Sequence, residues 1–482
     1  MSTKFTSEQL KQINLGFKNG LTMEQVTTYS DTRFNSGQME QIRLGYEEGL
    51  TEEQVKLYAK TELSWLHMKE LRKAWRKCVK YEHMKKLANP KFSLDCLDYL
   101  ISCYSSWVGD TSRSYIFSIF NLATNPNFNL EQMKEITRGI GSSTVWEYAN
   151  PKFSAKQMEQ IRLAGNHPGF MKYCNPKFSA NQMKQIRLGY ENGLSDEMVV
   201  VYAKPVFQSE QMEQIRKGFE NGLSDKKVQS YADPKFDRNV MWQMRLGYED
   251  GLSIDMVAKY AKSEFEWQQM AEIRLGYENG LSNEQIKIYA NKSFSEKQMK
   301  EIRLGFESNL TLEQILVYAN VDVHSEVMFF IRCKYEEGLI LEKAKEIASY
   351  KIPRIELIWK NVKFQIAECI NQDIDKSMIE ELIEKFCDIK YIDDPVYSTP
   401  DIIYNIDNQK LSLCLDCCLR GMRKDEIALL TSSDFSIEQM KEIELGLSSK
   451  LSTVLVELYA KKSLSATEMK QRREELLKMK KE

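Results

Sequence analysis

The stretch FEWQQMAEIRLGYENGLSNEQIKIYANKS at residues 265–293 decides the fold, because its pattern returns along most of the chain. Residues 34–62, FNSGQMEQIRLGYEEGLTEEQVKLYAKTE, repeat the same residue types at the same positions. A fixed period of this length is typical of a solenoid, whose stacked units share one continuous core. The residue that opens each copy recurs every 29 positions, at Phe5 and Phe34, then at Phe178, Phe207, Phe236, Phe265 and Phe294, with Leu63, Phe92 and Val323 in the same register.

Each copy has the signals of two short helices joined by a turn. Ser295 with Gln298, and Thr51 with Gln54, have the spacing of capping boxes at the two helix starts. Asn309 stands once where the other copies have a glycine, which indicates a left-handed residue at the end of the first helix. Prolines two residues before an opening position end the second helix, at 90, 126, 151, 176, 205 and 234.

We therefore expect an all-α fold, an α-solenoid of tandem two-helix repeats with about fifteen units and no β-sheet. On a helical wheel Met39, Ile42 and Tyr46 share one face, Leu44 points nearly opposite, and Gly45 leaves room for another backbone. The second helix is too short to be stable alone, so each unit depends on stacking against its neighbours.

The chain divides into five segments that differ in how closely they follow the repeat. Residues 1–62 and 178–348 hold regular repeats, 63–177 divergent and shortened ones, 349–433 an atypical helical segment, and 434–482 terminal repeats with a charged tail. Three successive openers are only 25 residues apart, at Phe128, Phe153 and Phe178, so the first-helix end and its loop should lose about one turn. Residues 371–401 are acidic and predict a distinct subdomain or a kink, through Asp373, Asp375, Glu380, Glu381, Glu384, Asp388, Asp393 and Asp394.

The unit QMxQIRLGYExGL…YAxPxF resembles the short helical repeats found in many uncharacterised proteins of Firmicutes and their mobile elements. The resemblance covers most of residues 1–338 and 434–464 and leaves 350–430 outside. It implies a helical-repeat fold but no activity, because that repeat has no assigned biochemical role. A regulator or inhibitor of a cellular machine is what its occurrence in mobile elements suggests by analogy.

Composition sets limits on the partner. Lysine and arginine number 67 against 69 aspartate and glutamate, so the net charge is −2 and no global field favours nucleic acid or membrane. Charged residues make up 28% and hydrophobic ones 42%, as in a folded helical protein. No apolar leader or run of about 18 apolar residues is present, so we expect a cytoplasmic protein without a membrane partner.

Signals of enzymatic activity are absent from the sequence. It contains no phosphate loop, dinucleotide fingerprint or H-E-x-x-H motif, and its four histidines are scattered, so we expect no enzyme, no cofactor and no small-molecule substrate. Cys414, Cys417 and Cys418 have the spacing of a zinc half-site that only Cys369 and Cys387 could complete. Buried, reduced core cysteines are the favoured interpretation of all ten, at 78, 96, 103, 174, 333, 369, 387, 414, 417 and 418.

Two residue types recur with the period of the repeat. An arginine of the first helix could contact one phosphate or base per unit, but a glutamate four residues later and the near-zero net charge favour ion pairing along the stack. The tyrosine that ends the second helix is never replaced by phenylalanine, which indicates a hydrogen bond, most simply across the inter-unit interface, or less simply a platform for bases. The arginines are at 43, 162, 187, 216, 245, 274, 303 and 332, and the tyrosines at 29, 58, 148, 173, 202, 231, 260, 289, 318 and 459.

Residues 69–91 are the best local candidate for an anionic partner, although a solvated helix face is the simpler interpretation. Nine basic side chains there stand against Glu70 and Glu82 and are interleaved with aromatic residues. His167, in the shortened loop, has no acidic neighbour in sequence and fits a turn residue. The candidate partner-binding residues are Arg72, Lys73, Trp75, Arg76, Lys77, Lys80, His167 and Pro168. We expect a non-catalytic scaffold that binds a protein; the alternative is binding of RNA or DNA through residues 69–91.

Overall fold

The computed structural model describes residues 4–77, 79–107, 113–351, 355, 358–392 and 401–480, with the backbone alone at 107, 113, 114, 387–392 and 401–405. The chain forms two compact units, Met1–Arg245 and Leu246–Glu482, which are described separately. Both are built from helix pairs. The predicted all-α fold of tandem two-helix repeats is thus confirmed.

In the described residues, fifteen consecutive helix pairs are followed by one last helix. The first helices of the pairs and the last helix are α1 (Ser7–Lys18), α3 (Ser36–Glu47), α5 (Trp65–Arg76), α7 (Leu94–Trp107), α9 (Leu130–Arg138), α11 (Ala155–Ala164), α13 (Ala180–Glu191), α15 (Ser209–Glu220), α17 (Arg238–Glu249), α19 (Trp267–Glu278), α21 (Glu296–Glu307), α23 (Ser325–Glu336), α25 (Lys360–Asn371), α27 (Asn408–Leu419), α29 (Ile437–Ser448) and α31 (Ala466–Met479). The second helices are α2 (Met23–Thr27), α4 (Glu52–Tyr58), α6 (Tyr81–Leu87), α8 (Arg113–Ala123), α10 (Val145–Tyr148), α12 (Pro168–Met171), α14 (Asp196–Tyr202), α16 (Asp225–Tyr231), α18 (Ile254–Tyr260), α20 (Asn283–Tyr289), α22 (Leu312–Tyr318), α24 (Leu341–Ser349), α26 (Lys376–Lys385), α28 (Lys424–Leu430) and α30 (Thr453–Glu457).

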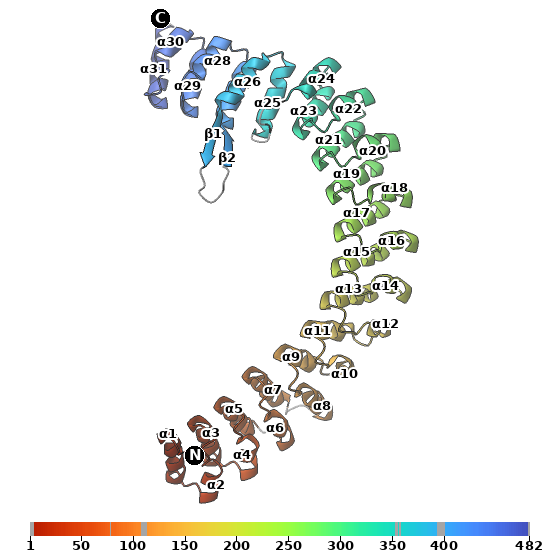
Figure 1. Cartoon of the computed structure of the whole chain (residues 1–482), viewed down its shortest axis with the longest axis vertical. Coiled ribbons are helices and arrows are strands. Elements are labelled where there is room, and N and C mark those ends of the chain that lie inside the picture. The colour runs from red at the N-terminus through yellow and green to blue at the C-terminus, as the bar shows by residue number, and fades with distance from the viewer. Residues whose placement is uncertain are drawn as a thin grey trace. The chain divides into compact units, whose positions relative to one another are not determined.

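Within each compact unit the helices form two rows. First helices pack against first helices from α1 to α15 in one unit and from α19 to α31 in the other, and Figure 1 shows the second helices in a row beside them. Each pair therefore presents two surfaces to solvent, which we call the first-helix face and the second-helix face. None of the described helices is long and apolar enough to cross a membrane.

The turn between the two helices has the predicted left-handed residue. Gly193 has φ 83°. The next residue, Leu194, donates its N–H to the carbonyl of Gly189 in the last turn of the first helix at 2.9 Å. Asn309, at φ 61°, adopts the same conformation, so the interpretation of that substitution is confirmed. The capping boxes are also present, for example at Ser295 with Gln298.

The tyrosine at the end of the second helix packs inside its own unit. The Tyr202 hydroxyl donates to the Gln185 carbonyl of the preceding first helix at 3.4 Å, and the same contact recurs along the chain. The predicted hydrogen bond exists, but the expectation that it crosses the inter-unit interface was wrong. A methyl group on Gly189 would lie 2.0 Å from that hydroxyl. The helix glycine therefore makes room for a tyrosine side chain, not for another backbone.

A glutamine three residues into the first helix joins neighbouring units. The Gln182 side-chain oxygen accepts the Ser179 N–H at 2.7 Å, and its nitrogen donates to the carbonyls of Pro205 at 3.2 Å and Phe207 at 2.6 Å. One side chain thus caps its own helix and fixes the loop that opens the next unit. In the third unit His67 takes this position, with its ring nitrogens 2.7 Å from the Ser64 hydroxyl and 2.8 Å from the Phe92 carbonyl.

The first helices of the shortened units at 128–177 lose residues as predicted, and their second helices are also shorter, which the sequence did not indicate. Helices α9 and α11 have nine and ten residues where regular first helices have twelve, and α10 and α12 have four where regular second helices have seven. Pro168 stands at the first position of α12, where its missing N–H has no helical partner to lose.

The atypical segment follows the repeat more closely than its sequence indicates. Helices α25 and α26 enclose Asp373 at φ 59°, and α27 and α28 enclose Gly421 at φ 81°, so both pairs keep the turn of the regular units. Between them lies an antiparallel hairpin of β1 (Cys387–Ile392) and β2 (Asp401–Ile406), paired from Cys387 with Ile406 to Ile392 with Asp401. The expectation of no β-sheet was wrong at this hairpin, because its β-branched and aromatic residues favour paired strands. Of the acidic run, Asp393 and Asp394 lie outside the described residues.

Candidate partner-binding surface

The recurring arginines are held in ion pairs and hydrogen bonds along the first-helix row. Arg216 donates to the Gln185 side chain of the preceding unit at 2.9 Å and to Glu220 of its own helix at 2.5 Å. Arg303 repeats this with Glu272 at 2.8 Å and Glu307 at 2.7 Å, and its guanidinium is only 7% exposed. These arginines therefore pair along the stack, which is the interpretation that the near-zero net charge favoured over contact with nucleic acid.

Arg72 belongs to the same series. It lies 29 residues after Arg43, is 7% exposed, and donates to Gln41 at 3.2 Å and to Glu48. A solvated helix face was the simpler interpretation of residues 69–91, and the structure contradicts it at Arg72. Removing this guanidinium would leave Glu48 partly buried without its main partner.

The remaining basic residues of 69–91 divide between the two faces. Along α5, Lys69 lies 5.9 Å over the Trp65 ring, Lys73 pairs with Glu70 at 3.1 Å, and the 62% exposed Arg76 side chain pairs with Glu48 at 2.8 Å. Lys77 is exposed just beyond this helix. The structure therefore does not gather the nine basic side chains into one patch, and two acids offset part of the charge on α5.

The second part of the segment lies at α6, on the second-helix face. Lys80 lies 4.9 Å over the Phe117 ring, and Lys86 donates to Asn121 at 2.8 Å. Trp75 does not form a surface platform for bases. Its indole nitrogen is buried without a hydrogen-bond partner, and the centroid of its ring lies 6.3 Å from that of Tyr81. Burial and the nearby lysines lower the pKa of His83, which packs among aromatic rings.

His167 and Pro168 begin α12, as a turn interpretation requires. The structure also places an acidic residue, Asp196, in this group, although it lies 29 residues after His167 in the sequence. The His167 ring lies 4.6 Å from the Tyr190 ring, and the Tyr190 hydroxyl donates to Asp196 at 2.8 Å. Lys172 completes the group with a hydrogen bond to Asp196 that lowers the pKa of this carboxyl. Burial raises the pKa of Tyr190, so its hydroxyl stays protonated. His167 and Lys172 belong to one unit and Tyr190 and Asp196 to the next, and their contacts therefore join the two units.

A different feature of the first-helix face was missed in the sequence. The fifth residue after each N-cap lies on this face and is never buried in the first eight units. Its charge alternates in sign from unit to unit without exception, through Lys11, Glu40, Lys69, Asp98, Lys134, Glu159, Lys184 and Glu213. No ion pair joins two of these eight described residues. We call this series the alternating ridge; comparing the charge at one repeat position across all units would have found it.

Four of the five exposed tryptophans among the described residues lie on first helices or at their N-caps, and the fifth, Trp146 (51% exposed), lies on the second helix α10. Trp65 (41% exposed) and Trp267 (37%) are first residues of their helices, Trp359 (53%) is an N-cap, and Trp242 (37%) is a fifth residue that follows the ridge. Trp242 and Arg238 border a pocket of about 260 Å³ between α15 and α17, whose other wall includes Glu210 and Glu213. Large aromatic side chains at the surface are typical anchors of protein interfaces.

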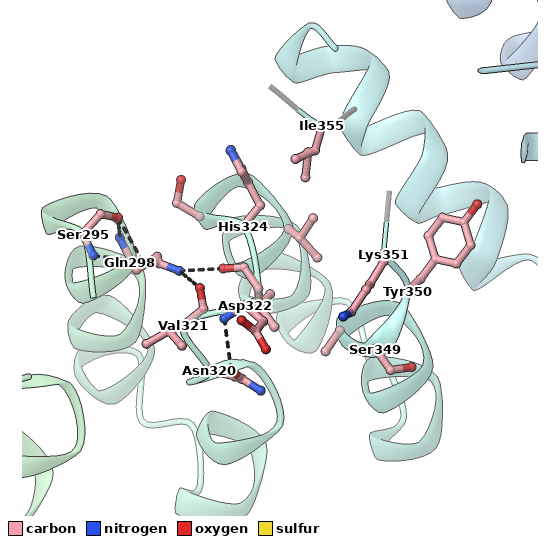
Figure 2. A pocket seen from close by; sticks show the side chains of 14 residues that line it. Ser295, Gln298, Asn320, Val321, Asp322, His324, Ser349, Tyr350, Lys351 and Ile355 are labelled. Carbon is pink, nitrogen blue, oxygen red and sulfur yellow. Dashed lines mark hydrogen bonds between the residues drawn. The ribbon is translucent and has the colours of Figure 1, made fainter. Parts of the chain in front are cut away.

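The second compact unit holds a larger pocket, of about 560 Å³, at a junction without a glutamine bridge. In the preceding unit Gln298 forms the bridge, donating to the carbonyls of Val321 and Val323 at 2.9 Å each. The unit of α23 has Val327 in the glutamine position, so it has no such bridge to the unit that follows. Figure 2 shows the space that opens between His324 on one side and Tyr350 with Lys351 on the other. The described residues that line the pocket offer hydrogen-bonding groups, among them Ser295, Asp322 and His324.

The cysteine cluster is packed in the core. Cys414, Cys417 and Cys418 are buried in α27, and burial raises the pKa of Cys417 to about 12, so its thiol is protonated. No group of three or more potential metal ligands occurs among the described residues, which exclude Cys78 and the side chain of Cys387.

Comparison with known proteins adds no assignment. No protein-family model matches the chain, and no curated protein matches it significantly.

Proposed function

We propose that the protein is a non-catalytic scaffold whose first-helix face, within residues 1–245, binds another protein. The alternating ridge carries this proposal. Adjacent packed helices lie about 8–10 Å apart, so the ridge presents opposite charges at that spacing. A nucleic acid backbone is uniformly anionic and would meet a carboxylate at every second unit. A protein surface can supply both signs, and matching them gives specificity and orientation more than raw affinity.

The exposed aromatic residues support the same partner class. Trp65 lies beside the ridge residue Lys69, and Trp242 follows the last ridge residue at the same repeat position. Tryptophan contributes a large contact area with few rotatable bonds and is enriched among the residues that dominate binding energy. The ridge would then set the register of the partner while the tryptophans provide most of the affinity.

The biological role that fits a non-catalytic binder is regulation or inhibition of another protein. The sequence resemblance to repeats of Firmicutes mobile elements supports this by analogy, since such elements encode proteins that act on cellular machines.

Affinity capture from the host cell, followed by mass spectrometry, tests the proposal. The informative variant exchanges Glu40→Lys and Lys69→Glu, which keeps net charge but breaks the alternation. Its matched control, Glu53→Lys with Lys226→Glu, makes the same exchange on exposed second-helix residues. The wild type and the control should recover the same protein, and the ridge variant should lose it. Equal recovery by all three chains would contradict the proposal.

Nucleic acid binding is the second candidate, supported by one observation. Lys85 and Lys86 are exposed on α6 beside Tyr81, which is 42% exposed, and this is the least compensated part of 69–91. Titration of mixed-sequence single-stranded RNA should show no tight binding at about 150 mM salt. Tight, salt-sensitive binding that Lys80→Gln, Lys85→Gln and Lys86→Gln together abolish would transfer the assignment to RNA.

A further inference from the structure

The ridge residues lie at the centre of the solvent-facing side of the first helices. Lys11, Asp98 and Lys184 are exposed, and the other five are half-buried. Among the described residues, Glu40 and Glu159 form neither an ion pair nor a hydrogen bond, so their carboxylates are free to contact a partner. Adjacent first helices pack about 8–10 Å apart, and consecutive ridge charges are therefore separated by a similar distance.

This spacing restricts the conformation of a partner segment that follows the ridge. In a polyproline II helix every third residue lies on the same side, at a rise of about 9.3 Å. An α-helix returns to the same side after seven residues, at about 10.5 Å. A β-strand does so after two residues, at about 6.6 Å, or after four, at about 13 Å. Of these periods, that of polyproline II falls within the distance between packed helices, and the others lose register along eight units.

An aromatic side chain lies between two residues of the ridge. Trp65 is the first residue of α5 and packs over Gly37 of α3, where an added Cβ would lie 3.1 Å from the indole ring. Gly37 precedes Glu40 by three residues, and the Lys69 ammonium lies 5.9 Å from the centroid of the Trp65 ring. The indole is thus held across the junction of two units, with an acid on one side and a base on the other.

The exposed indole suits a polyproline II segment in two ways. Its ring is 41% exposed and offers a flat apolar surface, of the kind on which proline-rich segments dock. Among the described residues, none accepts a hydrogen bond from the Trp65 N–H. The carbonyls of a polyproline II helix have no internal hydrogen bonds and can accept this N–H, whereas those inside an α-helix are already bonded.

We propose that the alternating ridge binds an extended, proline-rich segment of the partner protein, in which every third residue faces the ridge and alternates between acid and base. This inference rests on the proposed function, because it specifies which part of the partner contacts the first-helix face. Acids of the segment lie opposite ridge lysines such as Lys69, and bases lie opposite ridge acids such as Glu40. Prolines between them pack on Trp65. A polyproline II segment is already ordered before it binds, so little conformational entropy is lost on binding.

Fluorescence anisotropy with labelled synthetic peptides and the full-length protein tests the proposal. The first peptide is Glu-Pro-Pro-Lys-Pro-Pro repeated four times. The second has the same composition, with all its Glu-Pro-Pro units before its Lys-Pro-Pro units. In full register with the ridge, half of the charges of this block peptide meet a like charge. The alternating peptide should bind at least about tenfold more tightly at low salt. Equal affinities, or no binding of the alternating peptide, would overturn the proposal.

A third peptide separates backbone conformation from charge order. It is an alanine-based helix in which glutamate and lysine alternate at every seventh residue. Its charges face one side, but their spacing exceeds that of the ridge. It should bind at least about tenfold more weakly than the alternating proline peptide. Binding as tight as that of the proline peptide would refute the polyproline II conformation.

Tryptophan variants locate the contact on the protein. Trp65→Ala should weaken binding of the alternating peptide by about tenfold, because an exposed aromatic anchor is lost. Trp65→Phe keeps a ring without the N–H and should give an intermediate affinity. The matched control is Trp146→Ala, at a 51% exposed position on the second helix α10, and it should bind like the wild type. An unchanged affinity of Trp65→Ala would contradict the placement of the segment over this residue.

The charge exchange separates this inference from the proposed function. Glu40→Lys with Lys69→Glu should weaken binding of the alternating peptide by about three- to tenfold, since two of the eight charge pairs become repulsive. If affinity capture recovers a protein that this exchange abolishes, but the alternating peptide does not bind, the proposed function stands and the extended segment is refuted.

Discussion

At the scale of single residues, the contact between glycine and tyrosine explains why the two occur together: the units with Ala74 and Lys334 at the glycine position have Leu87 and Ile347 at the tyrosine position. Gly189→Ala should destabilise the protein by about 1–3 kcal/mol, because the new methyl group would overlap the Tyr202 hydroxyl. The same substitution in a Tyr202→Phe background should cost much less, since the nearest ring carbon is 3.3 Å away. Urea unfolding of the four chains measures the coupling; additive effects would show that the two residues do not share this contact.

His83 should make stability depend on pH. Its pKa is lowered from 6.5, chiefly by burial, so the folded protein keeps the ring neutral where the unfolded chain binds a proton. The contribution is full above pH 6.5 and is lost as pH falls from there toward the folded-state pKa. His83→Phe removes the titrating group, and its melting temperature should fall less than that of the wild type between pH 7 and pH 5.5. Parallel curves for the two proteins would contradict this assignment.

At the scale of helices, the bridging glutamine makes the stack cooperative. Gln182→Glu should destabilise the protein by about 2–4 kcal/mol, because the amide donor is lost and a carboxylate would face the Pro205 and Phe207 carbonyls. Gln182→His should cost less, since His67 in the third unit contacts both its cap residue Ser64 and the Phe92 carbonyl, the equivalent of Phe207. Thermal unfolding at pH 8, where the imidazole is neutral, measures the order; a histidine variant less stable than the glutamate variant would be the opposite result.

The helices and turns could be predicted from the sequence because their signals are local. Capping residues, turn glycines and prolines determine backbone geometry within a few residues, and even the substitution at Asn309 was interpretable. Contacts between units were harder to predict, because they join residues that lie 23 to 31 positions apart in the sequence. Examples are Gln182 with Phe207 and Arg216 with Gln185. Arg72 illustrates the consequence: its local neighbours are basic, and only its partners in the preceding unit show that it is buried.

At the scale of the whole chain, the hairpin shows where the repeat tolerates an insertion. Residues 387–405 lie between Phe386 and Ile406, which ends the strand before α27, and Asp407 donates to the Phe386 carbonyl at 2.9 Å. The insertion leaves both flanking helix pairs intact because it joins at a junction between units. The acidic composition of this stretch predicted a departure from the repeat but not its strand structure.

The surface that we propose as the partner-binding site was the least predictable feature of the molecule. Local charge density pointed to residues 69–91, whose members the fold distributes over two faces. The alternating ridge depends on residues about 29 positions apart, such as Glu40 and Lys69, and appears only when units are superposed in register.

Cross-linking of the captured complex, with mass spectrometry of the linked peptides, tests the central claim most directly. An amine-reactive reagent should link the partner to the ridge lysines Lys11, Lys69, Lys134 and Lys184, and leave Lys56 and Lys226 of the second helices unlinked. Links concentrated on the second helices, or a complex that contains nuclease-sensitive nucleic acid and no protein, would contradict the assignment of the first-helix face as a protein-binding surface.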